Sequence, residues 1–330
     1  MIQDIKKYNI LSKFQTSKFL NHSKLELDFR ENLIYDVGTS VLGSLLSQCI
    51  NVKDLSINLQ DNCILDEGST KLGDSLGFCK EIQHLILQLQ CNKIGCQGAQ
   101  SLGQGIANIS SLQTLEINLN LNVIGSQGVS GLLSALENCQ NLTRLNLQFQ
   151  QNWIGDQGVA FISNFLEQKQ NLQELTLNLK ESCICFKGIN DLCNKLETCQ
   201  NLKSLYLDLS NNYFRTDGVI SLSKMLMKQI NLVYLTLSLE RIQANSQGFK
   251  NLSDGLQSCT NIKILRLNLK KNRFTASGVQ ELAKGLKCCK QLRIAYFDFK
   301  QNSMLTIFIC EVIVQMAQCH NISFLSLNFD

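Results

Sequence analysis

The sequence contains no proline, no long hydrophobic run and no marked excess of either charge. Average usage of about 5% would place roughly 16 prolines in a chain of this length, whereas none occurs among the 330 residues. Nothing therefore breaks a helix or removes a donor from a strand ladder. No run of about 18 apolar residues occurs, so we expect no membrane-spanning segment and no membrane partner. The net charge of +4 gives no reason to expect a nucleic-acid partner.

What the chain does have is a period of 30 residues, which runs from residue 21 to the end without an insertion or deletion. One place in the period is held by Leu25, Leu55, Leu85, Leu115, Leu145, Leu175, Leu205, Leu235 and Leu265, then by Ala295 and Leu325. Such a period indicates a solenoid in which each unit contacts only its neighbours. We predict one domain, 21–330, of ten 30-residue repeats plus a terminal strand. Residues 1–20, where lysines interrupt the apolar residues, are expected to be an N-terminal basic flank or cap and not a signal peptide.

Each repeat predicts one strand followed by one helix. Leu175, Leu177 and Leu179 alternate with polar residues, which is the pattern of a strand with one buried face. An asparagine follows in most repeats, and we expect its amide to bond to backbone groups of neighbouring repeats as a ladder. An aspartate, serine or threonine then suits the capping of the helix, as at Asp66 and Asp156. A glycine stands two places later, where we expect its missing side chain to let the layers approach.

Fifteen cysteines are present, an odd number. Seven share one repeat place, where a small, weakly polar side chain suits the end of a helix. The seven are Cys49, Cys79, Cys139, Cys199, Cys259, Cys289 and Cys319. We expect reduced thiols, which indicates an intracellular, cytoplasmic protein.

The pattern LxxLxLxLxxNxIGxxGxxxLxxxL, seen over 142–166 with conservative changes, resembles the leucine-rich repeat of the ribonuclease-inhibitor-like class. The resemblance covers 21–330, although the strand holds one more alternating pair than that class usually has. It implies an α/β horseshoe solenoid with a parallel β-sheet on the concave face and α-helices on the convex face. It also implies that the concave face binds a partner.

The sequence offers little for catalysis, metal binding or a cofactor. The three histidines lie far apart in the sequence. The cysteines near 183–199 either flank a buried apolar residue of the repeat or belong to its helix, so we predict no metal site. Neither a phosphate-binding loop nor the signature set of a protein kinase is present. We therefore predict no enzyme and no cofactor.

We predict a binding site from the residues at the exposed positions of the strands. In the C-terminal half these positions hold large aromatic and apolar residues and one arginine, of the kinds that dominate interface hot spots. The predicted partner-binding residues are Tyr206, Tyr234, Ile264, Arg266, Ile294, Tyr296 and Phe324. The alternative is that terminal repeats are degenerate or covered by a cap.

The sequence therefore predicts a non-enzymatic scaffold that binds a protein partner through the concave face. Two other readings stay open. One is a regulator that stimulates GTPases, resembling the Ran GTPase activators of the same repeat class, with Arg241 or Arg273 on the rim. The other is the sensor arm of a larger kinase or nucleotide-binding receptor.

Overall fold

The computed structural model describes residues 6–15, 22–273, 275–302 and 322–329. They fall into two compact units, Met1–Ile154 and Gly155–Asp330, which are called unit 1 and unit 2 below. The elements of unit 1 are β1 (Lys6–Tyr8), α1 (Leu11–Gln15), β2 (Lys24–Asp28), α2 (Tyr35–Leu46), β3 (Asp54–Asn58), α3 (Asp66–Leu76), β4 (His84–Gln88), α4 (Cys96–Ala107), β5 (Thr114–Asn118), α5 (Gly125–Leu136) and β6 (Arg144–Gln148). The elements of unit 2 are α6 (Gly155–Glu167), β7 (Glu174–Asn178), α7 (Phe186–Leu196), β8 (Ser204–Asp208), α8 (Arg215–Lys228), β9 (Tyr234–Ser238), α9 (Ser246–Ser258), β10 (Ile264–Asn268), α10 (Ala276–Leu286), β11 (Ile294–Asp298) and β12 (Phe324–Asn328).

Within each unit the strands form a parallel sheet in the order of the chain. Strands β1 to β6 pair in sequence in unit 1, and β7 to β12 do so in unit 2. The 30-residue period sets the register, so that Leu25 lies opposite Leu55 and Leu265 opposite Ala295. The expected alternation of strand and helix is confirmed.

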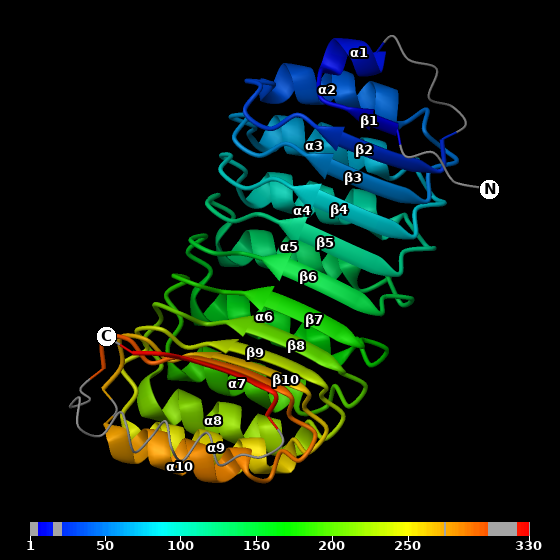
Figure 1. Cartoon of the computed structure of the whole chain (residues 1–330). Helices are drawn as coiled ribbons and strands as arrows, with labels where there is room; N and C mark the ends of the chain where they lie inside the picture. The colour runs from blue at the N-terminus through cyan, green and yellow to red at the C-terminus, as the bar shows by residue number, and fades with distance from the viewer. Residues whose placement is uncertain (1–5, 16–21, 274, 303–321, 330) are drawn as a thin grey trace. The chain divides into compact units, whose positions relative to one another are not determined.

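The period-2 pattern of each strand decides which of its side chains are buried. In β8, Leu205 and Leu207 are buried, while Ser204, Tyr206 and Asp208 remain partly accessible. The helices of each unit lie together on one side of its sheet, and consecutive helices pack against each other (Figure 1). Buried leucines of strand and helix therefore form the core, and the other face of each sheet carries no described helix. We call that other face the open face.

The predicted asparagine ladder is present in both units. Asn62 illustrates it: its Oδ1 accepts hydrogen bonds from the backbone N–H of Asn32 (3.0 Å) and of Ile34 (3.1 Å) in the preceding repeat. Its Nδ2 donates to the carbonyl oxygens of Phe29 (2.8 Å) and Gln60 (3.0 Å). The same bonding recurs at Asn92, Asn122, Asn152, Asn212 and Asn272. One amide thus satisfies backbone groups that have left the strand ladder and are buried from water.

At α3, α4 and α7 the capping carboxylate comes from the preceding repeat, which differs from the expectation. At α9 the cap is local, because Asn245 accepts from the backbone N–H of Gln247 and Gly248. Asp66 Oδ1 accepts from the backbone N–H of Gly95 (2.6 Å) and Gly98 (3.0 Å), at the start of the next helix, α4. Asp156 accepts in the same way from Cys185, just before α7. A side chain at Gly98 would collide with the Asp66 carboxylate. The recurrent glycine therefore leaves room for the neighbouring repeat's cap, and repeats are joined at this end too.

The recurrent cysteines are buried in the described residues, outside which Cys319 lies, and four of them bond to the preceding repeat. The thiol of Cys79 donates to the carbonyl oxygen of Leu46 (3.2 Å) at the end of α2, and that of Cys259 donates to Leu226 (3.3 Å) in α8. Gln229, which replaces cysteine at this place, bonds Leu196 in the same way. The last carbonyl groups of a helix have no partner within it, so these side chains fulfil a structural role.

Residues at the N-terminus extend the sheet of unit 1. Strand β1 pairs in parallel with β2, and Phe14 of α1 is buried. The rings of Tyr8 and Phe14 lie 5.1 Å apart. None of the described helices combines the length and the apolarity that a membrane crossing requires.

Candidate functional site

Over β8 to β12 the open face of unit 2 is ordered into three rows, because every second residue of each strand points to it. The first row holds Ser204, Tyr234, Ile264, Ile294 and Phe324. The middle row holds Tyr206, Thr236, Arg266, Tyr296 and Ser326. The last row holds Asp208, Ser238, Asn268, Asp298 and Asn328. Each row runs across paired strands in register.

A column of stacked side chains crosses three strands, from Arg266 and Tyr296 of the middle row to Phe324 of the first row. The guanidinium carbon of Arg266 lies 4.7 Å from the centroid of the Tyr296 ring, which is a cation–π geometry. The rings of Tyr296 and Phe324 lie 5.3 Å apart with a tilt of 46°. Tyr296 is half-buried by these contacts and not sealed in the core. The column holds two aromatic rings and a cation in fixed positions.

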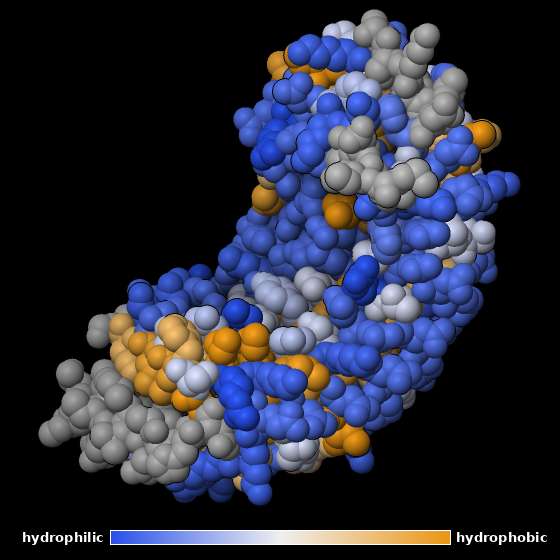
Figure 2. Space-filling view, turned by 45° about the vertical axis from the view of Figure 1, so that its right-hand side comes forward, coloured by the Kyte–Doolittle hydropathy of each residue, from blue (hydrophilic) through white to orange (hydrophobic). Residues whose placement is uncertain are grey.

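The first row is the apolar part of the open face. Tyr234, Ile264, Ile294 and Phe324 stand on four consecutive strands, and Tyr234 and Phe324 are 48% and 50% exposed. Hydrophobic residues gather in the lower part of Figure 2, on an otherwise hydrophilic surface. Exposed apolar residues that adjoin each other on a sheet are unusual without a partner. The row contrasts with Lys24, Asp54, His84, Thr114 and Arg144 at the same place in unit 1.

The middle and last rows enclose a shallow depression of about 270 Å³. Tyr206, Arg266 and Tyr296 line it, together with the smaller side chains of Thr236 and Ser238. Burial, and then the nearby Asp208 carboxylate, raises the pKa of Tyr206, so its hydroxyl stays protonated. The structure thus brings three of the seven predicted residues to one depression. It places the other four, Tyr234, Ile264, Ile294 and Phe324, along the first row.

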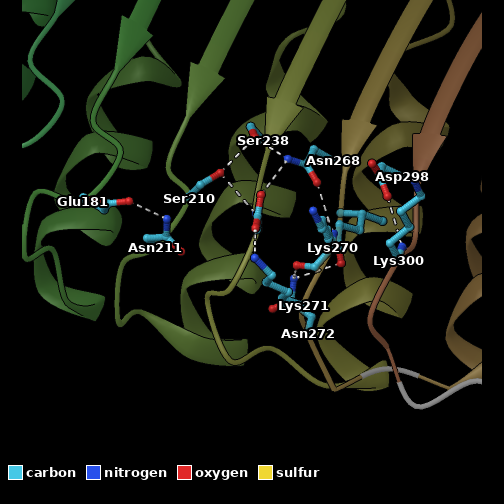
Figure 3. A network of polar contacts seen from close by, with 12 residues as sticks. Glu181, Ser210, Asn211, Ser238, Asn268, Lys270, Lys271, Asn272, Asp298 and Lys300 are labelled. Atoms are coloured by element: carbon cyan, nitrogen blue, oxygen red, sulfur yellow. Dashed lines mark hydrogen bonds and ion pairs between the residues drawn. The ribbon is translucent and has the colours of Figure 1, made fainter. Parts of the chain in front are cut away.

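A network of polar contacts follows the last row where the strands end (Figure 3). The hydroxyls of Ser210 and Ser238 lie 2.8 Å apart, and Asn268 Nδ2 donates to Ser238 (3.0 Å). Lys271 Nζ lies 3.0 Å from Glu240 Oε1. Burial by itself raises the pKa of Glu240, but the bonds from Lys271 and Asn268 outweigh it and hold that pKa below its usual value. Glu240 is therefore an ionised, fully engaged carboxylate.

Sequence reasoning did not assign the loop lysines that adjoin this network. Lys270 and Lys271 follow β10, and Lys300 follows β11. Arg241 and Arg273, considered above for GTPase regulation, are exposed in the loops after β9 and β10. Two adjacent lysines directly after a predicted strand were the feature of the sequence that could have pointed to this cationic edge. Their relation to the open face depends on register between repeats.

Unit 1 has a second depression on its own open face, of about 280 Å³. Lys24 and Asp54 form an ion pair there (2.9 Å), and His84 Nδ1 lies 3.0 Å from the hydroxyl of Thr114. Glu26 in its lining is paired with Lys7 (2.6 Å). Among the described residues, no tyrosine or phenylalanine lines this depression, which distinguishes it from the one in unit 2.

The recurrent buried cysteines are not reactive thiols. Burial raises the pKa of Cys79 and of Cys199 to about 11, and of Cys259 to about 12. Thiols with such pKa values are poor nucleophiles at neutral pH. Over the described ranges, no group of three histidine, cysteine or acidic side chains is arranged to hold a metal ion.

Comparison with known proteins supports the repeat assignment. Residues 138–163 and 260–283 match the family described as Leucine Rich repeat. A chain from the Rad7 and Elc1 complex in yeast is similar in fold, at 17% identity and a TM-score of 0.57, over 90% of this chain and 69% of that chain. Internalin C2 from Listeria monocytogenes aligns at 16% identity and a TM-score of 0.37, over 87% and 84% of the two chains. No curated protein sequence matches the chain.

At these identities the solved structures bear on the fold alone, and the ribonuclease-inhibitor-like class stays a prediction. The in-register strands, the asparagine ladder and the matched segments agree with one another. The chain is built of leucine-rich repeats, and the family model matches segments in both units.

Proposed function

We propose that the chain is a non-enzymatic interaction scaffold and that the open face of unit 2 binds a protein partner. Leucine-rich repeat proteins use their extended sheet surfaces for binding. The observation that carries the proposal is the column of Arg266, Tyr296 and Phe324 beside the apolar first row. Aromatic and arginine side chains held rigidly on a surface lose little entropy on binding and bury a large area.

The chemistry of the face favours a protein over a small substrate. Three of the seven proposed contact residues line the depression, which is shallow, and four lie along a row that spans four strands at about 4.8 Å each. Such a surface suits a polypeptide segment that crosses the strands. The yeast Rad7 structure was solved as a complex with Elc1, which fits a protein partner for this fold.

The test is partner capture by a double variant, Tyr206→Ala with Tyr296→Ala. Both side chains are half-buried on the surface, so we expect the melting temperature to change little and capture to fall about tenfold or more. The matched control is Tyr213→Ala, which removes an equally large, 59% exposed tyrosine from a loop outside the three rows. Capture would be quantified by affinity purification with mass spectrometry. Equal capture by the double variant and wild type would reject this surface.

We further infer a reducing, cytoplasmic location. No disulfide joins the described cysteines, and several donate their S–H to carbonyl oxygens, a role that an oxidised sulfur could not fill. Disulfides are rare where thiols are kept reduced. A fluorescent fusion should show cytoplasmic signal, and recovery of the protein from the culture medium would contradict the inference.

A further inference from the structure

Five cationic side chains lie in the loops that follow β9, β10 and β11. They are Arg241, Lys270, Lys271, Arg273 and Lys300, and we call them the basic rim. Arg241, Lys271 and Arg273 are exposed, and Lys270 and Lys300 are partly so. In unit 1 the places equivalent to Lys270 and Lys300 hold Arg30 after β2, which is paired with Asp28 (2.6 Å), and neutral amides after β3 to β6. These amides are Gln60, Gln90, Asn120 and Gln150.

A backbone ladder holds the cations of the basic rim in register. The N–H of Arg241 donates to the carbonyl of Lys270 (3.0 Å), and that of Lys271 donates to Lys300 (2.9 Å). Like charges therefore stand at the same place in adjacent repeats, Arg241 beside Lys271 and Lys270 beside Lys300. Glu240 balances Lys271, whereas Lys270 and Lys300 stand beside each other without an ion pair to any described residue, and like charges at such a distance repel.

Among the described residues, the carboxylates of Glu240 and Asp298 adjoin the basic rim and offset only part of its charge. Glu240 forms an ion pair with Lys271 and accepts a hydrogen bond from Asn268. Asp298 Oδ1 accepts from the backbone N–H of Lys300 (3.1 Å). Lys270, Lys300, Arg241 and Arg273 form no ion pair with another described residue. The rim therefore presents a concentrated positive potential to solvent.

The basic rim continues the open face. Along β10 and the loop after it, the chain passes from Ile264 in the first row to Arg266, Asn268 and then Lys270. At about 3.3 Å per residue, the apolar row and the rim are roughly 20 Å apart. The surface thus changes in order from apolar, through aromatic and amide, to cationic.

We propose that the partner segment is an acidic amphipathic polypeptide that lies across β9 to β12. Its apolar side chains contact the first row, and its aspartate or glutamate side chains contact the basic rim. The inference rests on the proposed function, because it assigns chemistry to the partner of the same face. Charge complementarity of this kind raises association rates and excludes basic competitors.

The test selects ligands for the full chain from a displayed library of random peptides. We expect selected peptides to combine acidic residues with aromatic or aliphatic ones. Their binding should weaken severalfold when salt rises from about 0.1 M to about 0.5 M. A random single-stranded oligonucleotide is the second probe. Selection of neutral or basic peptides, or tighter binding of the oligonucleotide than of any peptide, would overturn the proposal.

Charge variants then locate the contact. The triple variant Lys270→Gln, Arg273→Gln and Lys300→Gln should bind the selected peptides about tenfold or more weakly. It should be at least as stable as wild type, because repulsion is removed. The control, Lys53→Gln, Lys80→Gln and Lys93→Gln, removes the same charge from exposed sites in unit 1 and should bind normally. Equal losses in both triple variants would overturn the assignment to the basic rim.

The double tyrosine variant separates this inference from the proposed function. If peptides lose affinity for Tyr206→Ala with Tyr296→Ala but keep it for the rim variant, the open face binds and the acidic assignment is wrong. If neither variant loses affinity, both proposals fail. Loss in both variants supports a single partner on the two surfaces, whereas loss in the rim variant alone rejects the shared site.

Discussion

Asn92 shows how one side chain joins two repeats. Its Oδ1 accepts from the N–H of Asn62 (3.1 Å) and Ile64 (2.9 Å), and its Nδ2 donates to the carbonyls of Leu59 (2.9 Å) and Leu89 (3.0 Å). Asn92→Ala would leave these buried groups without partners, at about 1–3 kcal/mol for each group that water cannot reach. We expect the free energy of unfolding to fall by about 3–5 kcal/mol, measured by urea denaturation. Asn138→Ala, at an exposed site in α5's C-terminal loop, is the control and should cost less than about 0.5 kcal/mol.

The buried thiols predict a loss of stability in alkali. Burial raises the pKa of Cys49 to about 12 and that of Cys79 to about 11, from an ordinary value of 9.0. Above pH 9 the unfolded chain releases these protons while the folded chain keeps them. The contribution is therefore complete below pH 9 and is lost as the pH rises through the folded values. Urea unfolding at pH 8 and at about pH 10.5 should show a smaller fall for Cys79→Ala than for wild type. An equal fall in the free energy of unfolding for the variant and wild type would contradict this assignment.

At the scale of the element, capping between repeats makes α3, α4 and α7 depend on the preceding repeat. The Asp66 carboxylate accepts hydrogen bonds from the first backbone N–H groups of α4. Asp66→Ala should therefore destabilise α4 by about 1 kcal/mol. Hydrogen exchange should quicken at the start of α4 and not at the start of α3, where Asp66 itself lies. Asp66→Asn keeps an acceptor and should restore most of the protection. Faster exchange confined to α3 would show that the cap is local.

The sequence predicted the strands and helices well because the same pattern recurs in every repeat. Leu205 and Leu207 are buried and Tyr206 is half-buried, as alternation requires. The direction of capping was missed, because residues 29 and 32 places apart meet only once the stacking offset between repeats is known. The basic rim was missed for the same reason, since Arg241 and Lys271 become neighbours through the backbone ladder.

The whole molecule should tolerate changes in the number of repeats better than changes in their phase. One repeat orders 30 residues at about 1.5 kcal/mol each and buries too few apolar side chains to offset that cost, so stability comes from stacking. Deleting residues 81–110 removes one repeat in register, and we expect a folded chain with cooperative unfolding. Deleting 81–95 removes half a repeat, including β4, and joins the loop after α3 directly to the start of α4. Circular dichroism should show loss of structure only in the second case, and equal behaviour of the two would contradict the account.

Site-specific photo-crosslinking tests the central claim most directly, because it reports which surface of the intact chain meets a partner in the cell. A photoreactive residue would replace Thr236, in the depression of the open face, or Gln257, exposed on α9. The account predicts one defined crosslinked protein from position 236, lost when Tyr206 and Tyr296 are also changed to alanine, and none from position 257. Crosslinks of equal yield from the two positions, or from position 257 alone, would contradict it.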